Sequence, residues 1–182
     1  MSDYYLSGER VALGPMKAEL IPEYLRWAND IGAMRGFGRQ LPESLEARTK
    51  GFEVNAHSDI TIKFTVHHRQ TGEPVGITTL ILDQPVKTAE FLILLAPEAK
   101  GLGLAAEATR LTMDYGFHIS GVRMIHLTVL APNTAAIRAY RKAGFQDAGR
   151  VRQAGFWNGQ PCDELVMDAL PHDLKGLSLI AT

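Results

Sequence analysis

Residues 97–107 read Pro-Glu-Ala-Lys-Gly-Leu-Gly-Leu-Ala-Ala-Glu, and this stretch decides the fold. The apolar run Phe91–Ala96 predicts a buried strand, which Pro97 ends because proline cannot donate to a strand ladder. Helical periodicity begins after Gly103. The apolar residues of the predicted helix share one face: Leu104, Ala108, Leu111 and Tyr115.

A helix that begins at two glycines, Gly101 and Gly103, has the features of an anion-binding site. Its first backbone N–H groups have no partner within the helix, and the helix dipole favours negative charge there. Without Cβ atoms the chain can also close on the anion, and a pyrophosphate would suit such a site. The alternative is an ordinary strand-to-helix turn in which the glycines serve only the backbone dihedrals.

Composition indicates one domain of ordinary globular character. The chain has 182 residues, of which 46% are hydrophobic and 21% charged, and no linker-like stretch divides it. We therefore expect a single domain over residues 1–182, with a core from about 6 to 168 and a tail from 171 to 182. The formal net charge of −1 gives no bulk attraction for nucleic acid or for an anionic membrane.

The sequence shows no targeting or membrane-spanning segment. The N-terminus lacks a basic region followed by an apolar run, and no apolar stretch is long enough for a bilayer, so we expect a cytoplasmic protein. Cys162 is the single cysteine and excludes an intrachain disulfide. No histidines or carboxylates stand at metal-ligand spacing, so we expect no metal.

The remaining pattern predicts the element order βααβββαβαββ. We expect strands at 6–13, 60–67, 74–82, 88–96 and 122–130, a final antiparallel pair from 145–148 and 156–167, and helices at 18–28, 42–56, from 104 onward and at 133–143. The passage Gly32–Gln40 is expected to be irregular. This order predicts an α/β (mixed α+β) fold with a mostly antiparallel sheet, one parallel strand pair and about four helices.

A dinucleotide-binding reading of the same glycines fails. Gly101-Leu-Gly103-Leu-Ala-Ala106 also fits the pattern G-x-G-x-x-A, but that fold needs a carboxylate at the end of the next strand. Here that strand ends in Ala131-Pro132, and several elements precede the motif.

Two stretches together resemble a known family. Residues 97–105 and the later segment Asn133-Thr-Ala-Ala-Ile-Arg-Ala-Tyr140-Arg-Lys-Ala-Gly144-Phe145 are similar to the acetyl-CoA-binding signature and the following helix of the GNAT-type N-acetyltransferases. Residues 156–160, Phe-Trp-Asn-Gly-Gln, resemble the branch with spermidine N-acetyltransferases and ribosomal-protein N-terminal acetyltransferases. Lys100 departs from the family's Gln or Arg, which puts cofactor affinity in question because lysine lacks the bidentate fork.

The resemblance implies a set of cofactor contacts. The backbone of Ile93, Leu94 and Leu95 would pair with the pantetheine arm of acetyl-CoA as an added strand. The pyrophosphate would be held by Lys100, Gly101, Leu102, Gly103, Leu104 and Ala105. Asn133 would contact the arm, although Asn before Thr-Ala-Ala is also a good helix N-cap.

The resemblance also implies catalytic groups for amide formation, which needs a neutral amine, a stabilised oxyanion and a proton for the departing thiolate. Tyr140 stands where the family has its proton donor, with core packing as the alternative. Glu90, at the start of the strand that would carry the acetyl group, is the candidate base, with a solvated strand end as the alternative. The histidines near element ends are expected to be structural: His67, His68, His118 and His126.

The charges in the region of the early helices predict the kind of acceptor. Arg35 and Arg39 occupy the region where polyamine enzymes of the family place carboxylates, so we expect an amine that bears an anion, or a neutral amino sugar, rather than a polycation. The leading prediction is acetyl transfer to a small-molecule amine, such as a metabolite, amino sugar or antibiotic. Acetylation of a protein N-terminus and a non-catalytic acyl-CoA-binding module are the alternatives. Family members often dimerise, so a homodimer is possible.

Overall fold

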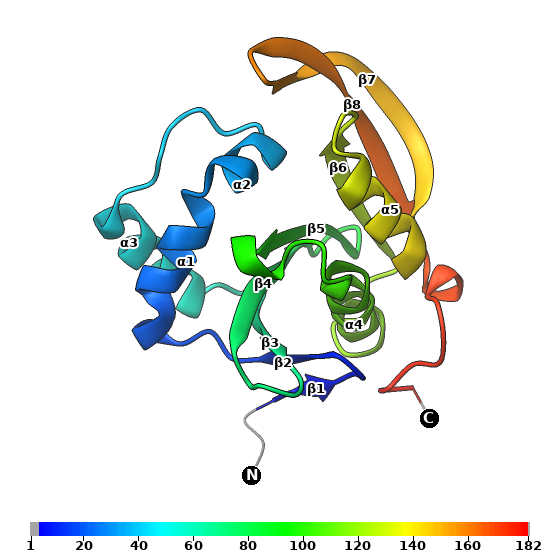
Figure 1. The fold of residues 1–182 in the computed structure, drawn as a ribbon. Helices are drawn as coiled ribbons and strands as arrows, with labels where there is room; N and C mark the ends of the chain where they lie inside the picture. The colour runs from blue at the N-terminus through cyan, green and yellow to red at the C-terminus, as the bar shows by residue number, and fades with distance from the viewer. Residues whose placement is uncertain (1–3, 182) are drawn as a thin grey trace.

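A computed structural model describes residues 4–181, and its centre is one eight-stranded sheet in the order β1-β2-β3-β4-β5-β6-β8-β7 (Figure 1). Every neighbouring pair is antiparallel except β5 and β6, which are parallel. This confirms the predicted mixed sheet with one parallel pair. The strands are β1 (Leu6–Ser7), β2 (Val11–Gly14), β3 (Thr61–His68), β4 (Pro74–Asp83), β5 (Thr88–Leu95), β6 (Met124–Leu130), β7 (Gln146–Trp157) and β8 (Gln160–Ala169).

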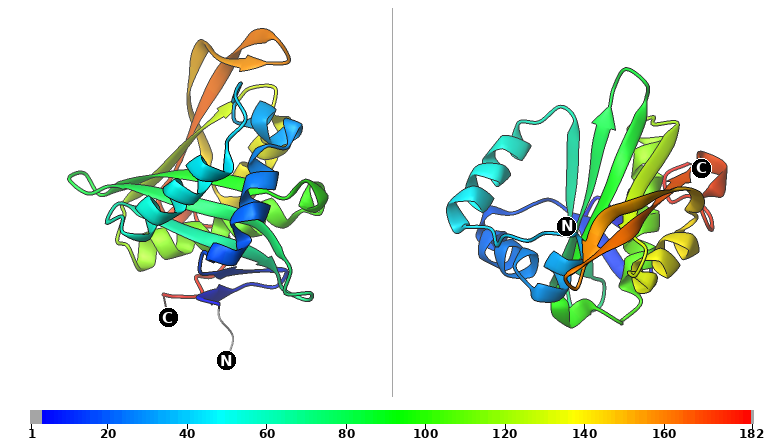
Figure 2. Two further views of the ribbon diagram at one scale, coloured as in Figure 1. Left: turned by 90° about the vertical axis from the view of Figure 1, so that its left-hand side faces the viewer. Right: turned by 90° about the horizontal axis from the view of Figure 1, so that it is seen from above.

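Helices cover both faces of the sheet. The first three lie over one face and the last two over the other, as the view from above in Figure 2 shows. Among the described residues, none of these helices is long and apolar enough to cross a membrane. The helices are α1 (Ile21–Ala28), α2 (Ile31–Gly36), α3 (Leu45–Ala56), α4 (Leu104–His118) and α5 (Thr134–Ala143), with short 3-10 turns at Ala18–Leu20, Pro97–Ala99 and Pro171–Asp173.

Two clusters of buried side chains fix the helices on the sheet. One contains Trp27 from α1 and Leu104 from α4, and the other contains Phe91, Ile125 and Met167 from the central and C-terminal strands. Because α4 contributes to both clusters, its position is determined by most of the core. The turn that opens α4 is therefore set on a rigid support.

The structure corrects three predictions of local structure. The passage Gly32–Gln40 is not wholly irregular, because Asp30 caps α2 by accepting a hydrogen bond from the Ala33 N–H at 2.9 Å. The first predicted strand is two strands, β1 and β2. The segment predicted as one strand at 156–167 contains a hairpin turn at Asn158 and Gly159, whose φ angles of 49° and 80° match the turn that joins two antiparallel strands most tightly.

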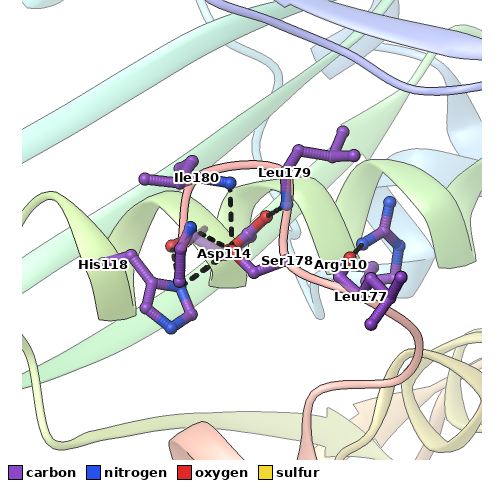
Figure 3. A network of polar contacts seen from close by, with 8 residues as sticks. Arg110, Asp114, His118, Leu177, Ser178, Leu179 and Ile180 are labelled. Carbon is purple, nitrogen blue, oxygen red and sulfur yellow. Dashed lines mark hydrogen bonds and ion pairs between the residues drawn. The ribbon is translucent and has the colours of Figure 1, made fainter.

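The C-terminal tail lies against α4 (Figure 3). The fully buried carboxylate of Asp114 accepts hydrogen bonds from the Ser178 hydroxyl at 2.6 Å and the Leu179 N–H at 2.7 Å, and lies 2.7 Å from His118 Nδ1. The Ser178 hydroxyl oxygen also lies beside Nδ1 of His118, at 3.4 Å, so serine and aspartate share the same ring nitrogen. A nucleophilic triad would place serine and aspartate on opposite ring nitrogens, so this cluster is a structural attachment of the tail.

Replacing Asp114 with alanine is expected to destabilise the protein by about 2–3 kcal/mol, because the partly buried Ser178 hydroxyl and Leu179 N–H lose their common acceptor. Ser178→Ala removes only one of these bonds and should cost about 1 kcal/mol. Urea denaturation of the two variants measures the difference. Equal stability of Asp114→Ala and the wild type would contradict this role for the carboxylate.

Candidate active site

The strands β5 and β6 begin side by side and then diverge. Their parallel register covers only Thr88–Glu90 with Met124–His126. Beyond this point β5 stays paired with β4, and β6 stays paired with β8. Residues 91–95 of β5 therefore have one edge with no neighbouring strand, where backbone N–H and C=O groups are open to a ligand.

A cavity of about 780 Å³ occupies this divergence and extends along the loop that opens α4. Its volume lies within the range of small-molecule sites, roughly 300–1,000 Å³. Residues from α2, β5, the loop, β6, α5, β7 and β8 line it. Of the predicted site residues, those that line it are Arg35, Glu90, Ile93, Leu94, Leu95, Lys100, Gly101, Gly103, Leu104, Ala105, Asn133 and Tyr140.

The loop before α4 presents free backbone donors. Gly101 and Gly103 have φ angles of 80° and 73°, which L side chains rarely adopt. Among the residues that the structure describes, the N–H groups of Gly101, Gly103, Leu104 and Ala105 donate to no protein atom, and no side chain caps α4. These amides fit a diphosphate. Leu102 differs from its neighbours, because its side chain is half exposed and does not line the cavity.

Lys100 is already engaged by a carboxylate. Its Nζ lies 2.5 Å from Oδ1 of Asp30, the residue that also caps α2. The hydrogen bond from Lys100 lowers the pKa of the Asp30 carboxyl below its ordinary value. The cation thus ties the loop before α4 to α2, while its other N–H donors and the free amides of the loop can still meet an anion.

Asn133 caps α5 and also faces the cavity. Its Oδ1 accepts a hydrogen bond from the Ala136 N–H at 3.3 Å. Its amide nitrogen is directed toward α2, since a Cβ on Gly36 would lie 3.5 Å from it. The capping role is therefore observed, and a contact with the cofactor arm stays a prediction.

Tyr140 stands in an aromatic cluster at the wall of the cavity. Its ring packs against Phe91 and Phe145, with centroid distances of 6.2 and 6.0 Å. Burial raises its pKa to about 12, because the dry surroundings disfavour the phenolate. The hydroxyl hence stays protonated at neutral pH, as a proton donor must.

Glu90 is half-buried at the last residue of the β5–β6 register, where the two strands begin to separate. It stands beside His126 in that register and lines the cavity. The carboxylate is thus placed at the apex of the divergence, within the same cavity as Tyr140.

The two predicted acceptor arginines are not brought together. Arg35 lines the cavity, where its guanidinium lies 4.9 Å from the centre of the Trp157 ring and donates to Oδ1 of Asn158 at 3.3 Å. Arg39 does not line the cavity and instead faces Glu43, with Nη1 at 3.8 Å from the carboxylate. Of these two arginines, only Arg35 therefore lies where it would repel a polycation in the cavity.

Sequence reasoning missed several charged or aromatic residues of the cavity lining, among them Trp157, Glu164 and Arg138. Trp157 at the end of β7 and Glu164 on β8 line it because the β7–β8 hairpin extends toward α2. Arg138 on α5 lines it too. The Asn-Gly dipeptide at 158–159 is a sequence signal that could have found two of them. It indicates a tight hairpin, and this hairpin carries Trp157 and Glu164.

The histidines and Cys162 lie outside the cavity lining. His67 is buried, and its Nδ1 lies 3.1 Å from the Gly72 carbonyl, while His118 belongs to the tail attachment. Within residues 4–181, no group of three or more His, Cys, Asp or Glu side chains is arranged to hold a metal ion.

A known protein family matches most of this chain. Residues 10–146 match the model of the acetyltransferase (GNAT) domain. The chain belongs to the GNAT acetyltransferase family. It is 30% identical over 167 residues to the spermidine N(1)-acetyltransferase of Escherichia coli (strain K12), covering 91% of this chain and 89% of that protein. It is 34% identical over 133 residues to an uncharacterized N-acetyltransferase of Bacillus subtilis, covering 71% and 75%.

Solved structures give the same result. The spermidine N-acetyltransferase of Vibrio cholerae, crystallised with CoA and spermine, superposes with a TM-score of 0.84 at 25% identity, covering 90% of this chain and 97% of that chain. As a GNAT acetyltransferase, the chain transfers an acetyl group from acetyl-CoA to a small-molecule amine, which confirms the leading prediction.

Proposed function

We propose that residues 1–182 form one N-acetyltransferase domain that acetylates a primary amine of an alkyl polyamine. The observation that carries the proposal is the divergence of β5 and β6, which opens one cavity onto both the free loop amides and the carboxylates Glu90 and Glu164. Within this one cavity, the loop amides would complement the anionic acetyl-CoA, and the two carboxylates would complement a cationic amine.

The donor would be held mainly by backbone groups. The N–H groups of Gly101, Gly103, Leu104 and Ala105 would bind the diphosphate, and the open edge of Ile93–Leu95 would pair with the pantetheine arm. Bound acetyl-CoA supplies an activated acyl group on a thiol leaving group. Because the amides are already directed into the cavity, binding requires little reorganisation of the loop.

Glu90 and Tyr140 would handle the protons. Glu90, directly or through a water, would remove a proton from the incoming ammonium, so that the nitrogen has a free lone pair. As the nitrogen forms its bond to the acetyl carbon and the carbon–sulfur bond breaks, Tyr140 would give its proton to the departing sulfur, and the tyrosinate would take up the second proton that the nitrogen loses in becoming an amide. The burial that raises the Tyr140 pKa also disfavours a thiolate at the same place. Because the phenolate and the thiolate are both disfavoured, transfer of the proton from Tyr140 to the sulfur remains feasible.

The charges in the part of the cavity near Glu90 and Glu164, where the acceptor would bind, support a cationic amine. Glu90 and Glu164 line the cavity, the Arg35 guanidinium lies against Trp157 and donates to Asn158, and Arg39 faces Glu43 outside the cavity. Relatives named as spermidine acetyltransferases point to the same class. Arg35 favours a second candidate, an amine that also bears an anionic group.

A thiol-release screen with acetyl-CoA tests the acceptor. Spermidine and spermine are expected to give the highest kcat/KM, above amino acids, amino sugars and peptides with N-terminal alanine or serine. Arg35→Glu should leave polyamine turnover intact or raise it, with Arg39→Glu as the matched control outside the cavity. Turnover confined to anionic amines and lost in Arg35→Glu would favour the second candidate.

Replacing Glu164 with glutamine is expected to raise the KM for spermidine about tenfold, because the substitution removes one attractive charge from the acceptor half. The affinity for CoA and the kcat should stay within about twofold of the wild type. Glu53→Gln, on the exposed side of α3, is the matched control. An unchanged KM in Glu164→Gln would exclude this carboxylate from acceptor binding.

A further inference from the structure

The turn between β1 and β2 is attached to the first turn of α4, although nearly a hundred residues separate them. The Glu107 carboxylate accepts the Glu9 N–H at 2.5 Å on Oε1 and the Arg10 N–H at 3.0 Å on Oε2. These two bonds fix the backbone at Arg10 relative to the helix that the cofactor loop opens.

The Arg10 side chain extends from this turn to the cofactor loop. Its Nη2 donates a hydrogen bond to the Leu102 carbonyl oxygen at 2.6 Å. A Cβ on Gly103 would lie 3.1 Å from Nη1, so the guanidinium also packs against the Gly103 backbone. Arg10 itself does not line the cavity.

The bond to the carbonyl determines where the next N–H points. The peptide unit is planar and trans, so the Leu102 C=O and the Gly103 N–H point in opposite directions. With the carbonyl held on the Arg10 side, the N–H is directed away from Arg10. Gly103 lines the cavity, and its N–H donates to no other described residue.

This peptide would otherwise rotate easily. Gly103 has no Cβ to restrict φ, and the reversed peptide would turn the Leu102 carbonyl, an acceptor, toward a bound anion. Lys100 would compensate less for a reversed peptide than an unpaired cation would, because part of its attraction for an anion is offset by the Asp30 carboxylate. The loop therefore depends on the orientation of its amides.

We infer that Arg10 is a positioning residue for the cofactor loop: it fixes the Leu102–Gly103 peptide so that the Gly103 N–H faces the diphosphate of CoA. The inference rests on the proposed assignment of this loop to the diphosphate. Glu107 completes the arrangement by holding the turn that carries Arg10.

Calorimetry with two ligands tests this role without any acceptor. Arg10→Met is expected to raise the Kd for CoA about tenfold, while the Kd for pantetheine, which has no diphosphate, stays unchanged. Arg10→Lys retains a donor and should recover part of the loss. Arg110→Met is the matched control, since Arg110 on α4 also donates to a backbone carbonyl, that of Leu177, at 3.2 Å (Figure 3).

The outcomes separate the inference from its premise. An unchanged Kd for CoA in Arg10→Met, or equal weakening of CoA and pantetheine, would overturn the positioning role. If wild-type protein bound CoA no better than pantetheine, the assignment of the loop to the diphosphate would fall, and this inference with it. If Arg10→Met does not fold, Glu107→Gln takes its place, because it weakens the attachment of the same turn. This variant must then bind CoA more weakly while its Kd for pantetheine stays unchanged. A Glu107→Gln protein without this selective loss would count against the role of Arg10.

Discussion

Replacing Tyr140 with phenylalanine lowers kcat by about 100-fold if the hydroxyl protonates the departing sulfur, since a positioned general acid contributes roughly 10²–10⁴-fold. The ring contacts with Phe91 and Phe145 are retained, so stability and the Kd for CoA should not change. Steady-state kinetics by thiol release, together with calorimetry, separates the two effects.

Tyr115→Phe is the matched control for this substitution. Tyr115 lies on α4, its ring packs against Phe64 at 4.9 Å, and it does not line the cavity. Its hydroxyl should therefore be dispensable for turnover. A Tyr140→Phe enzyme with wild-type kcat would show that Tyr140 serves only the aromatic packing.

The pH dependence of kcat gives a further test of Tyr140. Its pKa is raised to about 12 from the ordinary value of 10, so its hydroxyl remains protonated at pH values where a free tyrosine has already lost its proton. Loss of the proton donor should therefore cause no fall in kcat between pH 7 and about 10. A fall in that range that is absent from Tyr140→Phe would contradict the raised pKa.

Replacing Glu90 with glutamine is expected to lower kcat/KM by about 100-fold near pH 7. The variant cannot remove a proton from the ammonium, so it can use only the small fraction of amine that is already neutral in solution. A free alkylamine has a pKa near 10, so the defect should shrink as the pH approaches that value. A pH profile of kcat/KM for wild type and Glu90→Gln measures this recovery.

The pH-dependent recovery separates a base from a structural carboxylate. A substitution that merely disturbed the strands would lower activity equally at every pH. Glu53→Gln, in which a carboxylate outside the cavity is changed in the same way, should follow the wild-type profile. A constant defect in Glu90→Gln across the range would remove Glu90 from the role of base.

The loop before α4 and its place beside the cavity could be predicted from the sequence because the signals are local. The end of β5, the two glycines and the start of α4 follow one another within about fifteen residues, and each has a backbone reason to be where it is. The helix with Tyr140 begins at the capping residue Asn133. Turn chemistry and helical periodicity are sufficient for such segments.

The acceptor half could not be predicted in the same way, because distant segments build it. Arg35 and Arg39 looked alike in sequence, yet one meets Trp157 and the other faces Glu43. α2 was missed because Gly32 and Gly36 read as helix breakers, although Asp30 caps that helix.

Long-range polar contacts were equally out of reach. The pairing of Lys100 with Asp30 joins residues 70 positions apart, and the bond from Arg10 to Leu102 spans 92. No spacing rule connects side chains at such separations, so these contacts follow only from the packed sheet. They decide how the loop before α4 is held, which the glycine pattern alone does not.

An NMR titration of ¹⁵N-labelled protein with CoA identifies the backbone amides that bind it. The largest amide shifts are expected at Gly101, Gly103, Leu104 and Ala105, with a second group along residues 93–95 of β5. Saturation with CoA that left the resonances of both segments unmoved would contradict this expectation.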